Sequence, residues 1–362
     1  MRFSLLLATA LAATVLQGWA GTPKQASDIS QLYDNKFQAW VLKLQVAKSA
    51  AERNKIATEE RPDAIKACGE MWAVIKPNLA EPWTLEPAAW LLRTAAGKTV
   101  PGTEGRPPEP LVGPAVSKMI RDAVEKNHLA SKNLAPLCMS LVALNDPNSL
   151  PLLEKIERDS PDKQMQGVAA LGAAMLLKNL SDEPEVVRRR LTLLRKAIIE
   201  SSEVEIRGVS VAKMAEDELY IIQYLSKGRE APEITGTGSG GQPMNLSDYQ
   251  GKVVVLLFWR FDEDSSPQLL EMVRIMRERF KGKPLEIVGV NRDPQLQLRE
   301  LQATQHIEWP NFSDPDNKLG AQYRVATWPL AYVIDGKRQI HYVGPVTSFV
   351  ELTAAALLED KK

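Results

Sequence analysis

The sequence predicts an α-helical array followed by an α/β domain. Two observations carry this prediction. From Ser27 to about Lys227, apolar residues recur at helical spacing and strand signals are scarce. After Arg229 the pattern changes, and runs typical of buried strands alternate with helical segments. The predicted organisation is therefore a leader at residues 1–20, a helical array domain at 21–228 and an α/β domain at 229–362.

The leader has the features of a secretory signal peptide. Arg2 supplies a positive charge, Leu5–Leu16 is mostly apolar, and Gly18-Trp19-Ala20 offers small residues where a signal peptidase cleaves. The alternative is a membrane anchor, but a spanning helix needs about 20 apolar residues and this run is shorter. We expect a bacterial protein that is periplasmic or secreted, with no stable membrane insertion after cleavage.

The composition argues against several classes of partner. Lys plus Arg and Asp plus Glu number 45 each, so the formal net charge is zero. This balance gives no electrostatic indication of nucleic-acid binding. The three histidines are scattered without metal-ligand spacing. We therefore predict no metal site and no cofactor.

Cys68 and Cys138 are the only cysteines. In an oxidising compartment an even number of cysteines suggests a disulfide. The alternative is two buried free thiols, each packing as a small hydrophobic side chain. Sequence spacing does not give the distance between them, so both possibilities stay open.

Capping residues and prolines mark the starts of several helices in the array. Ser160-Pro161 predicts an N-cap followed by proline in the first turn, and Ser181–Pro184 starts a later helix. The last helix is predicted from about Val209 to Leu225. No clean repeat period is present, so the array is predicted to be irregular. The segment Thr99–Pro114 is rich in proline and glycine, which predicts an exposed loop or an extended partner-binding segment.

The elements of the C-terminal domain follow a thioredoxin-type order. A glycine-rich stretch at Thr235–Gln242 predicts a hairpin tip. The strands that follow are predicted at Lys252–Trp259, Leu285–Val290, Pro329–Ile334 and Gln339–Val343. The helices are predicted to begin at Ser266 and to cover Gln295–Gln305, Leu319–Tyr323 and Ser348–Leu358.

Several motifs in this domain resemble those of a known family. Asn245–Trp259 reads NLSDYQGKVVVLLFW, which is similar to the opening segment of the exported TlpA-like thiol–disulfide oxidoreductases and their AhpC/TSA relatives. Asp314–Val325 and Trp328–Asp335 resemble the segment that leads to the family's cis-proline and the next strand. The resemblance covers about residues 231–361. With the helical region, the chain also resembles long TlpA-like proteins of planctomycete and verrucomicrobial genomes.

The family's Cys-X-X-Cys is missing. Counting from Trp259, Glu263 and Ser266 occupy the two cysteine positions, and neither side chain can form or resolve a disulfide. The single cysteine that peroxiredoxins need in this region is also absent. Acidic residues at Asp262–Asp264 suit the positive end of a helix. A divalent-cation site is the alternative for them.

The resemblance therefore implies a redox-inactive module that binds a protein or an extended peptide. In the redox-active family, a peptide pairs with the backbone in a groove before the cis-proline, which corresponds here to Trp328-Pro329. Pairing of this kind needs backbone groups rather than cysteines. The alternative function is a thiol–disulfide oxidoreductase or a peroxiredoxin-type enzyme of the same superfamily.

Overall fold

The computed structural model describes residues 21–47, 50–101, 107–261 and 266–359. The predicted signal peptide lies outside these residues. Contacts within the chain divide it into two compact units between Ala212 and Lys213. In the described parts of both units, no helix is long and apolar enough to cross a membrane.

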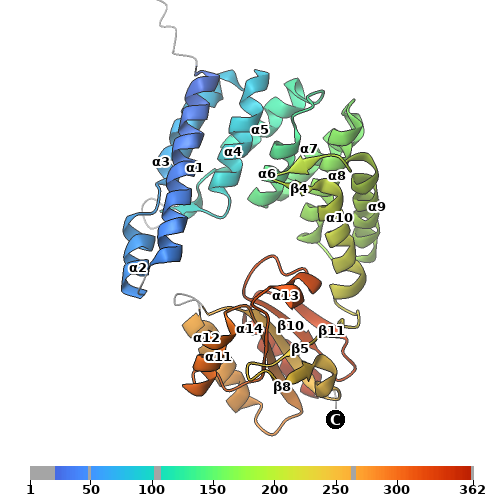
Figure 1. Ribbon diagram of the computed structural model, residues 1–362. Coiled ribbons are helices and arrows are strands. Elements are labelled where there is room, and N and C mark those ends of the chain that lie inside the picture. Colours follow the sequence, from blue (N-terminus) through green and yellow to red (C-terminus); the bar gives the residue numbers. More distant parts are fainter. Residues whose placement is uncertain (1–20, 48–49, 102–106, 262–265, 360–362) are drawn as a thin grey trace, which may run out of the picture. The chain divides into compact units, whose positions relative to one another are not determined.

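The first unit is a helical array with two layers (Figure 1). One layer holds α3, α4, α6 and α8, each in contact with the next, and α1, α5, α7 and α9 pack on them. The helices are α1 (Pro23–Val46), α2 (Ala50–Glu59), α3 (Ala64–Ile75), α4 (Leu85–Ala95), α5 (Pro114–Asn127), α6 (Ala135–Leu144), α7 (Leu150–Asp159), α8 (Lys163–Lys178) and α9 (Pro184–Glu200). The unit also holds two short strand pairs. β1 (Thr99–Val100) pairs with β2 (Glu109–Pro110) between α4 and α5, and β3 (Glu205–Ile206) pairs with β4 (Val209–Ser210) after α9.

The start of α8 differs from the prediction. The N-cap is Asp162 rather than Ser160, because the Asp162 carboxylate accepts hydrogen bonds from the amides of Gln164 and Met165 at 2.8 and 3.2 Å. The Ser160 hydroxyl accepts one longer bond, 3.3 Å from the Asp162 amide, and the Ser160 amide ends α7 by donating to Ile156. Pro161 therefore lies in the turn between the two helices.

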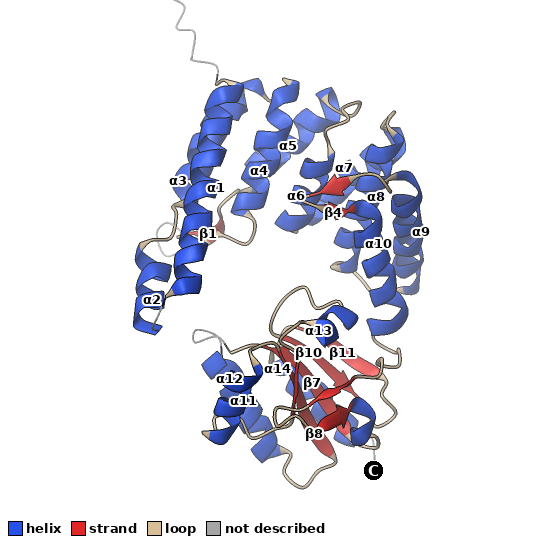
Figure 2. Cartoon of the chain, in the orientation of Figure 1, coloured by secondary structure: helices blue, strands red, loops and turns tan. Residues whose placement is uncertain are grey.

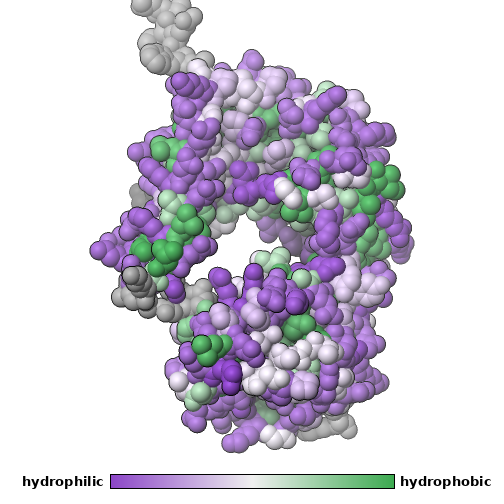
Figure 3. Space-filling view, in the orientation of Figure 1, coloured by the Kyte–Doolittle hydropathy of each residue, from purple (hydrophilic) through white to green (hydrophobic). Residues whose placement is uncertain are grey.

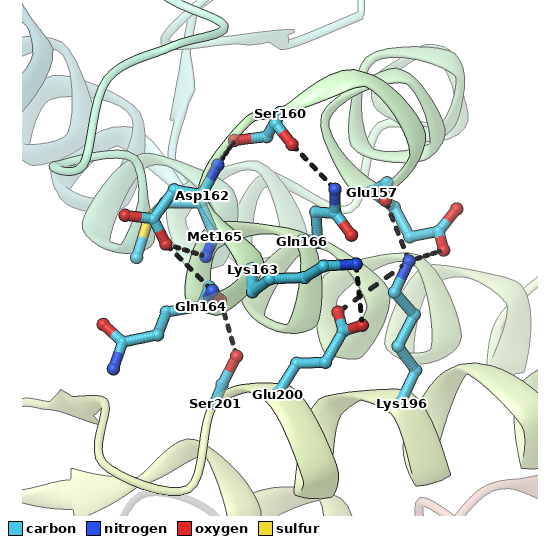
Figure 4. A network of polar contacts seen from close by, with 10 residues as sticks. All are labelled: Glu157, Ser160, Asp162, Lys163, Gln164, Met165, Gln166, Lys196, Glu200 and Ser201. Carbon is cyan, nitrogen blue, oxygen red and sulfur yellow. Dashed lines mark hydrogen bonds and ion pairs between the residues drawn. The ribbon is translucent and has the colours of Figure 1, made fainter.

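Polar side chains tie α7, α8 and α9 together around this turn (Figure 4). The Lys196 ammonium of α9 donates to the carbonyl oxygen of Glu157 at 3.0 Å and also meets the Glu157 carboxylate. The Ser201 hydroxyl, just after α9, donates to the Gln164 carbonyl at 2.5 Å. The bond to Glu157 gives a partner to a carbonyl in the last turn of α7, where the helix itself supplies none.

Some large apolar side chains of the first unit face solvent. Leu42 and Val46, near the end of α1, are 60% and 72% exposed. Figure 3 shows hydrophobic surface in this region, over the ends of α1 and α2. These two side chains lie outside the buried core of the unit.

The second unit contains a five-stranded sheet in the order β11-β10-β7-β8-β9 (Figure 2). β7, β8 and β9 are parallel, and β10 and β11 run antiparallel to their neighbours. The strands are β5 (Thr235–Thr237), β6 (Pro243–Asn245), β7 (Val253–Trp259), β8 (Leu285–Asn291), β9 (Asn311–Ser313), β10 (Leu330–Ile334) and β11 (Ile340–Gly344). The helices are α10 (Val211–Tyr220), α11 (Ser266–Arg279), α12 (Gln295–Ala303), α13 (Lys318–Gln322) and α14 (Ser348–Glu359). This is the predicted thioredoxin-like arrangement.

The central strand β7 is buried on both faces, as its continuous apolar run predicts. Val255, Leu257 and Trp259 pack into a core with residues of α11, α12 and α14. Leu256 and Phe258 point to the opposite core, where Met244 and Tyr323 also lie. The alternation follows from the two-residue period of a strand.

The division between the units falls earlier than the predicted boundary at 228/229. A π-helical turn, Ile221–Leu225, continues α10 and packs against the core of the second unit through Leu225. Tyr220 contacts the same core, and the Arg324 guanidinium lies 4.3 Å from its ring centre. The last predicted helix therefore belongs to the second unit from Lys213 onward.

Candidate docking site at the end of the sheet

The site predicted beside Trp328 and Pro329 lies where two strands meet. Leu330, the first residue of β10, pairs with Phe258 near the end of the antiparallel strand β7. The residues just before β10 therefore lie next to the chain that leaves β7. The Trp328–Pro329 peptide bond is cis, which is the state that the sequence resemblance implies.

The end of β7 is held by a buried hydrogen-bond chain. The Trp259 indole N–H donates to Asn311 Oδ1 at 2.8 Å, and Asn311 Nδ2 donates to the Trp309 carbonyl at 2.8 Å. A Cβ at Gly289 would overlap the Asn311 side chain, so this packing needs glycine there. Because Trp259 is fully buried, it positions the site and cannot contact a ligand.

Polar residues at the end of β8 hold Phe261, just after β7. Asp293 Oδ2 accepts hydrogen bonds from the Phe261 amide at 2.7 Å and from Asn291 Nδ2 at 2.8 Å. The Asp293 amide donates back to Asn291 Oδ1 at 3.0 Å. Sequence reasoning missed these residues, although polar side chains directly after a buried strand are a signal that could have found them.

Trp328 is half-buried, so it has both a packing side and an accessible side. Its ring meets Phe258 edge to face, with ring centres 6.2 Å apart. A Cβ at Gly320 would lie 3.1 Å from Cζ2 of Trp328, so the ring rests closely on that glycine. The Arg292 guanidinium lies over the ring, with Cζ 5.8 Å from its centre.

Asp314 fixes the segment on which Trp328 rests. Its carboxylate accepts hydrogen bonds from the amides of Lys318, Leu319 and Gly320 at 2.7, 3.1 and 2.9 Å. The carboxylate thereby satisfies the first amides of the short helix α13. The position of Gly320, and with it the surface under Trp328, follows from this cap.

Unpaired main-chain groups lie beside the ring. Within the described part of the chain, no backbone hydrogen bond engages the N–H or C=O of Thr327 or Trp328. Thr327 is exposed and Trp328 is partly buried, so this segment lies at the surface of the unit. We call the backbone of Thr327 and Trp328, together with the Arg292 side chain, the candidate docking site.

Comparison with known proteins finds a family that is similar to part of the second unit. Residues 227–343 match the AhpC/TSA family. Chloroplastic peroxiredoxin Q from Oryza sativa subsp. japonica is 27% identical over 129 residues, which are 33% of this chain and 58% of that protein. Thiol-disulfide oxidoreductase ResA from Bacillus subtilis is 24% identical over 117 residues, or 32% and 65% of the two chains. The chain thus spans less than two thirds of each of these relatives.

A solved structure is also similar to part of this chain. The thioredoxin domain of a thiol-disulfide oxidoreductase from Bacteroides vulgatus is 21% identical, with a TM-score of 0.33. The match covers 37% of this chain and 98% of that one.

The AhpC/TSA region of this chain contains no cysteine, since Cys68 and Cys138 both precede it. Of the two vacated cysteine positions, Ser266 is the first residue of α11 and Glu263 lies outside the described residues. The acidic run Asp262–Asp264 lies outside them as well. Elsewhere, in the residues that the structure describes, no three His, Cys, Asp or Glu side chains gather in a way that could hold a metal ion.

Of the two possibilities for Cys68 and Cys138, the suspected disulfide is not formed, and both are buried free thiols. Cys68 lies on α3 and Cys138 on α6, and α4 packs against both of these helices. Burial raises the pKa of Cys68 to about 11 and that of Cys138 to about 12. Because a thiolate is the reactive form, both thiols are poor nucleophiles at neutral pH.

Proposed function

We propose that this protein is an exported, redox-inactive member of the thioredoxin-like superfamily that binds an extended segment of a partner protein. The observation that carries the proposal concerns the main chain of Thr327 and Trp328, whose N–H and C=O groups make no backbone hydrogen bond within the described residues. They lie next to the end of β7, after which the family's two cysteines are missing from this sequence. An extended peptide can pair with such groups by β-augmentation. The partly exposed Trp328 ring offers a rigid apolar contact beside them.

The proposed loss of redox chemistry is tested by assaying the mature protein for insulin reduction with dithiothreitol and for peroxide consumption. Both rates are expected to equal the uncatalysed rates, because thiol–disulfide exchange needs an accessible thiolate. Turnover above background that survives Cys68→Ser with Cys138→Ser would show that another group performs the chemistry.

The names of the relatives favour a second candidate, an oxidoreductase of this superfamily. That function would have to use Cys68 or Cys138, which lie in the other unit and are buried. Turnover that disappears in the doubly substituted protein would support it and would overturn the proposal of redox inactivity.

The binding proposal is tested with a library of short cysteine-free peptides, screened by fluorescence anisotropy. A peptide that binds is then N-methylated at one amide at a time. Each methyl group removes one backbone donor. Main-chain pairing therefore predicts that methylation at one or two amides of the peptide abolishes binding, whereas methylation at the adjacent amides does not. Uniform tolerance of methylation would exclude this mode of binding.

The export proposal has its own measurement. Sequencing the N-terminus of the protein from the periplasm or medium is expected to find a start at Gly21, immediately after Ala20. Recovery of the uncleaved chain from the cytoplasm would contradict it.

A further inference from the structure

The candidate docking site includes one positively charged side chain, that of Arg292. Arg292 follows β8, and its amide donates to the Trp259 carbonyl at 3.1 Å, which ties it to the end of β7. Its side chain is exposed, and the guanidinium lies over the Trp328 ring. Stacking on an aromatic face restrains the guanidinium while its N–H groups remain available for a ligand.

The charge of Arg292 is not neutralised within the described part of the chain. No carboxylate there forms an ion pair with Arg292, whereas many other arginines have such a partner, as Arg338 has in Glu230. Asp293, the next residue in the chain, accepts from Phe261 and Asn291, and Asp314 caps α13, so both carboxylates have other partners. Both acids are buried, at 9% and 3% exposure.

We propose that the docking site selects peptides that carry a carboxylate, and that Arg292 binds this group next to Trp328. The inference rests on the proposed peptide-binding function and adds the chemistry of the ligand to it. A guanidinium can hold a carboxylate through two parallel N–H···O bonds, a geometry that lysine cannot provide. The backbone of Thr327 and Trp328 binds the main chain of the peptide, and Arg292 reads one charged group on it.

A carboxylate on a peptide has two sources, an acidic side chain and the chain terminus. Matched peptides separate them. For each peptide that binds in the library screen, a first pair tests the acidic side chain. Both of its members have an amidated C-terminus, and they differ only in having Glu or Gln at one internal position. A second pair lacks acidic side chains and compares a free with an amidated C-terminus. Affinities are measured by anisotropy against the full-length mature protein.

The test variant is Arg292→Gln, and Arg299→Gln is the matched control. Arg299 is an exposed arginine on α12 of the same unit, so the two substitutions change the net charge equally. With the wild type, we expect removal of the carboxylate in one of the two pairs to weaken binding at least about tenfold, the range for hydrogen bonds between charged groups. Arg292→Gln should abolish the preference for the peptide that carries the carboxylate, whereas Arg299→Gln should retain this preference. Added salt should reduce the preference in the wild type.

The outcomes separate this inference from the function on which it rests. If no peptide binds the wild type, both are overturned. If peptides bind with equal affinity whether or not they carry a carboxylate, or if Arg292→Gln retains the preference, only the selection of carboxylates is overturned. Thermal unfolding of both variants by circular dichroism shows whether they are folded, and the exposed position of Arg292 predicts that they are.

Discussion

Trp328 shows how one residue can serve packing and binding together. Its ring rests on Gly320 and meets Phe258, while its half-exposed side stands beside Arg292 and open backbone groups. Truncating Trp328 itself would therefore mix a loss of packing with any loss of binding. Substitutions at its neighbours separate the two contributions.

Gly320→Ala is expected to destabilise the second unit. The added Cβ would overlap Asn317 Oδ1 and press on the Trp328 ring at 3.1 Å, and overpacking of this kind costs about 1–3 kcal/mol. Urea unfolding followed by tryptophan fluorescence measures the change. Gly69→Ala is the matched control, because its Cβ would meet no atom within 4 Å in the interior of α3. It should stabilise by about 1 kcal/mol, and equal effects of the two substitutions would contradict the packing described for Gly320.

The buried thiols make stability depend on pH above about 9. An unfolded cysteine loses its proton near its ordinary pKa of 9.0, whereas folded Cys68 keeps it to about 11 and Cys138 to about 12. The unfolded state therefore binds fewer protons in this interval, so the free energy of unfolding falls as the pH rises. Each thiol contributes at most about 1.4 kcal/mol per pH unit to this fall.

The comparison of wild type with the Cys68→Ala and Cys138→Ala double variant measures this contribution. Any stability advantage of the wild type should be constant below about pH 9 and should shrink above it. Lys98 and the buried tyrosines titrate in both proteins, so their effects largely cancel in the difference. A difference that does not change with pH would contradict the raised pKa values.

At the scale of the elements, the turn between α7 and α8 depends on a carboxylate cap. Asp162 satisfies two amides at the start of α8, and Lys196 ties α9 back to the end of α7 (Figure 4). Gly167 of α8 packs against the Ser201 hydroxyl so closely that a Cβ would overlap it. The contact between α8 and α9 therefore requires glycine at this position.

Asp162→Ala is expected to lower the free energy of unfolding by about 1 kcal/mol, within the range of about 0.5–2 kcal/mol for lost N-caps. Ser160→Ala should cost less, because the Ser160 hydroxyl accepts only the longer bond from the Asp162 amide. Chemical denaturation of the two variants ranks them. The reverse order would identify Ser160 as the functional cap, as the sequence pattern alone suggests.

At the scale of the whole molecule, the second unit begins before its first strand. The π-helical turn after α10 places Leu225 fully inside the core of this unit. The segment after this turn is also bonded to the sheet, because the Gly228 amide donates to the carbonyl oxygen of Ile340 in β11 at 2.7 Å. The edge strand β11 is thereby covered along part of its length.

A fragment of residues 213–362 is expected to be more stable than a fragment of residues 229–362. The shorter fragment lacks Leu225, whose removal from a core costs about 2–5 kcal/mol by analogy with large-to-small substitutions. Urea unfolding of both fragments measures the difference. Equal stabilities would place the boundary at 228/229, where the sequence pattern changes.

Local patterns determined much of the second unit. The apolar run of β7 predicts burial on both faces, and the order of strands and helices predicts the thioredoxin-like sheet. The absence of cysteine after Cys138 requires no structure to recognise. The edge strand β9 was not predicted, because three residues are too few for a period of two to be distinguished from a loop.

Only the tertiary structure decided the features that depend on distances between residues remote in the sequence. It left Cys68 and Cys138 unpaired on helices that both pack against α4, moved the division between the units to Lys213, and chose Asp162 over Ser160 as the cap. It also brought Arg292, from the end of β8, over Trp328, which precedes β10. Sequence periodicity reports which side of an element is buried, whereas the pairing of two particular side chains depends on how the elements pack.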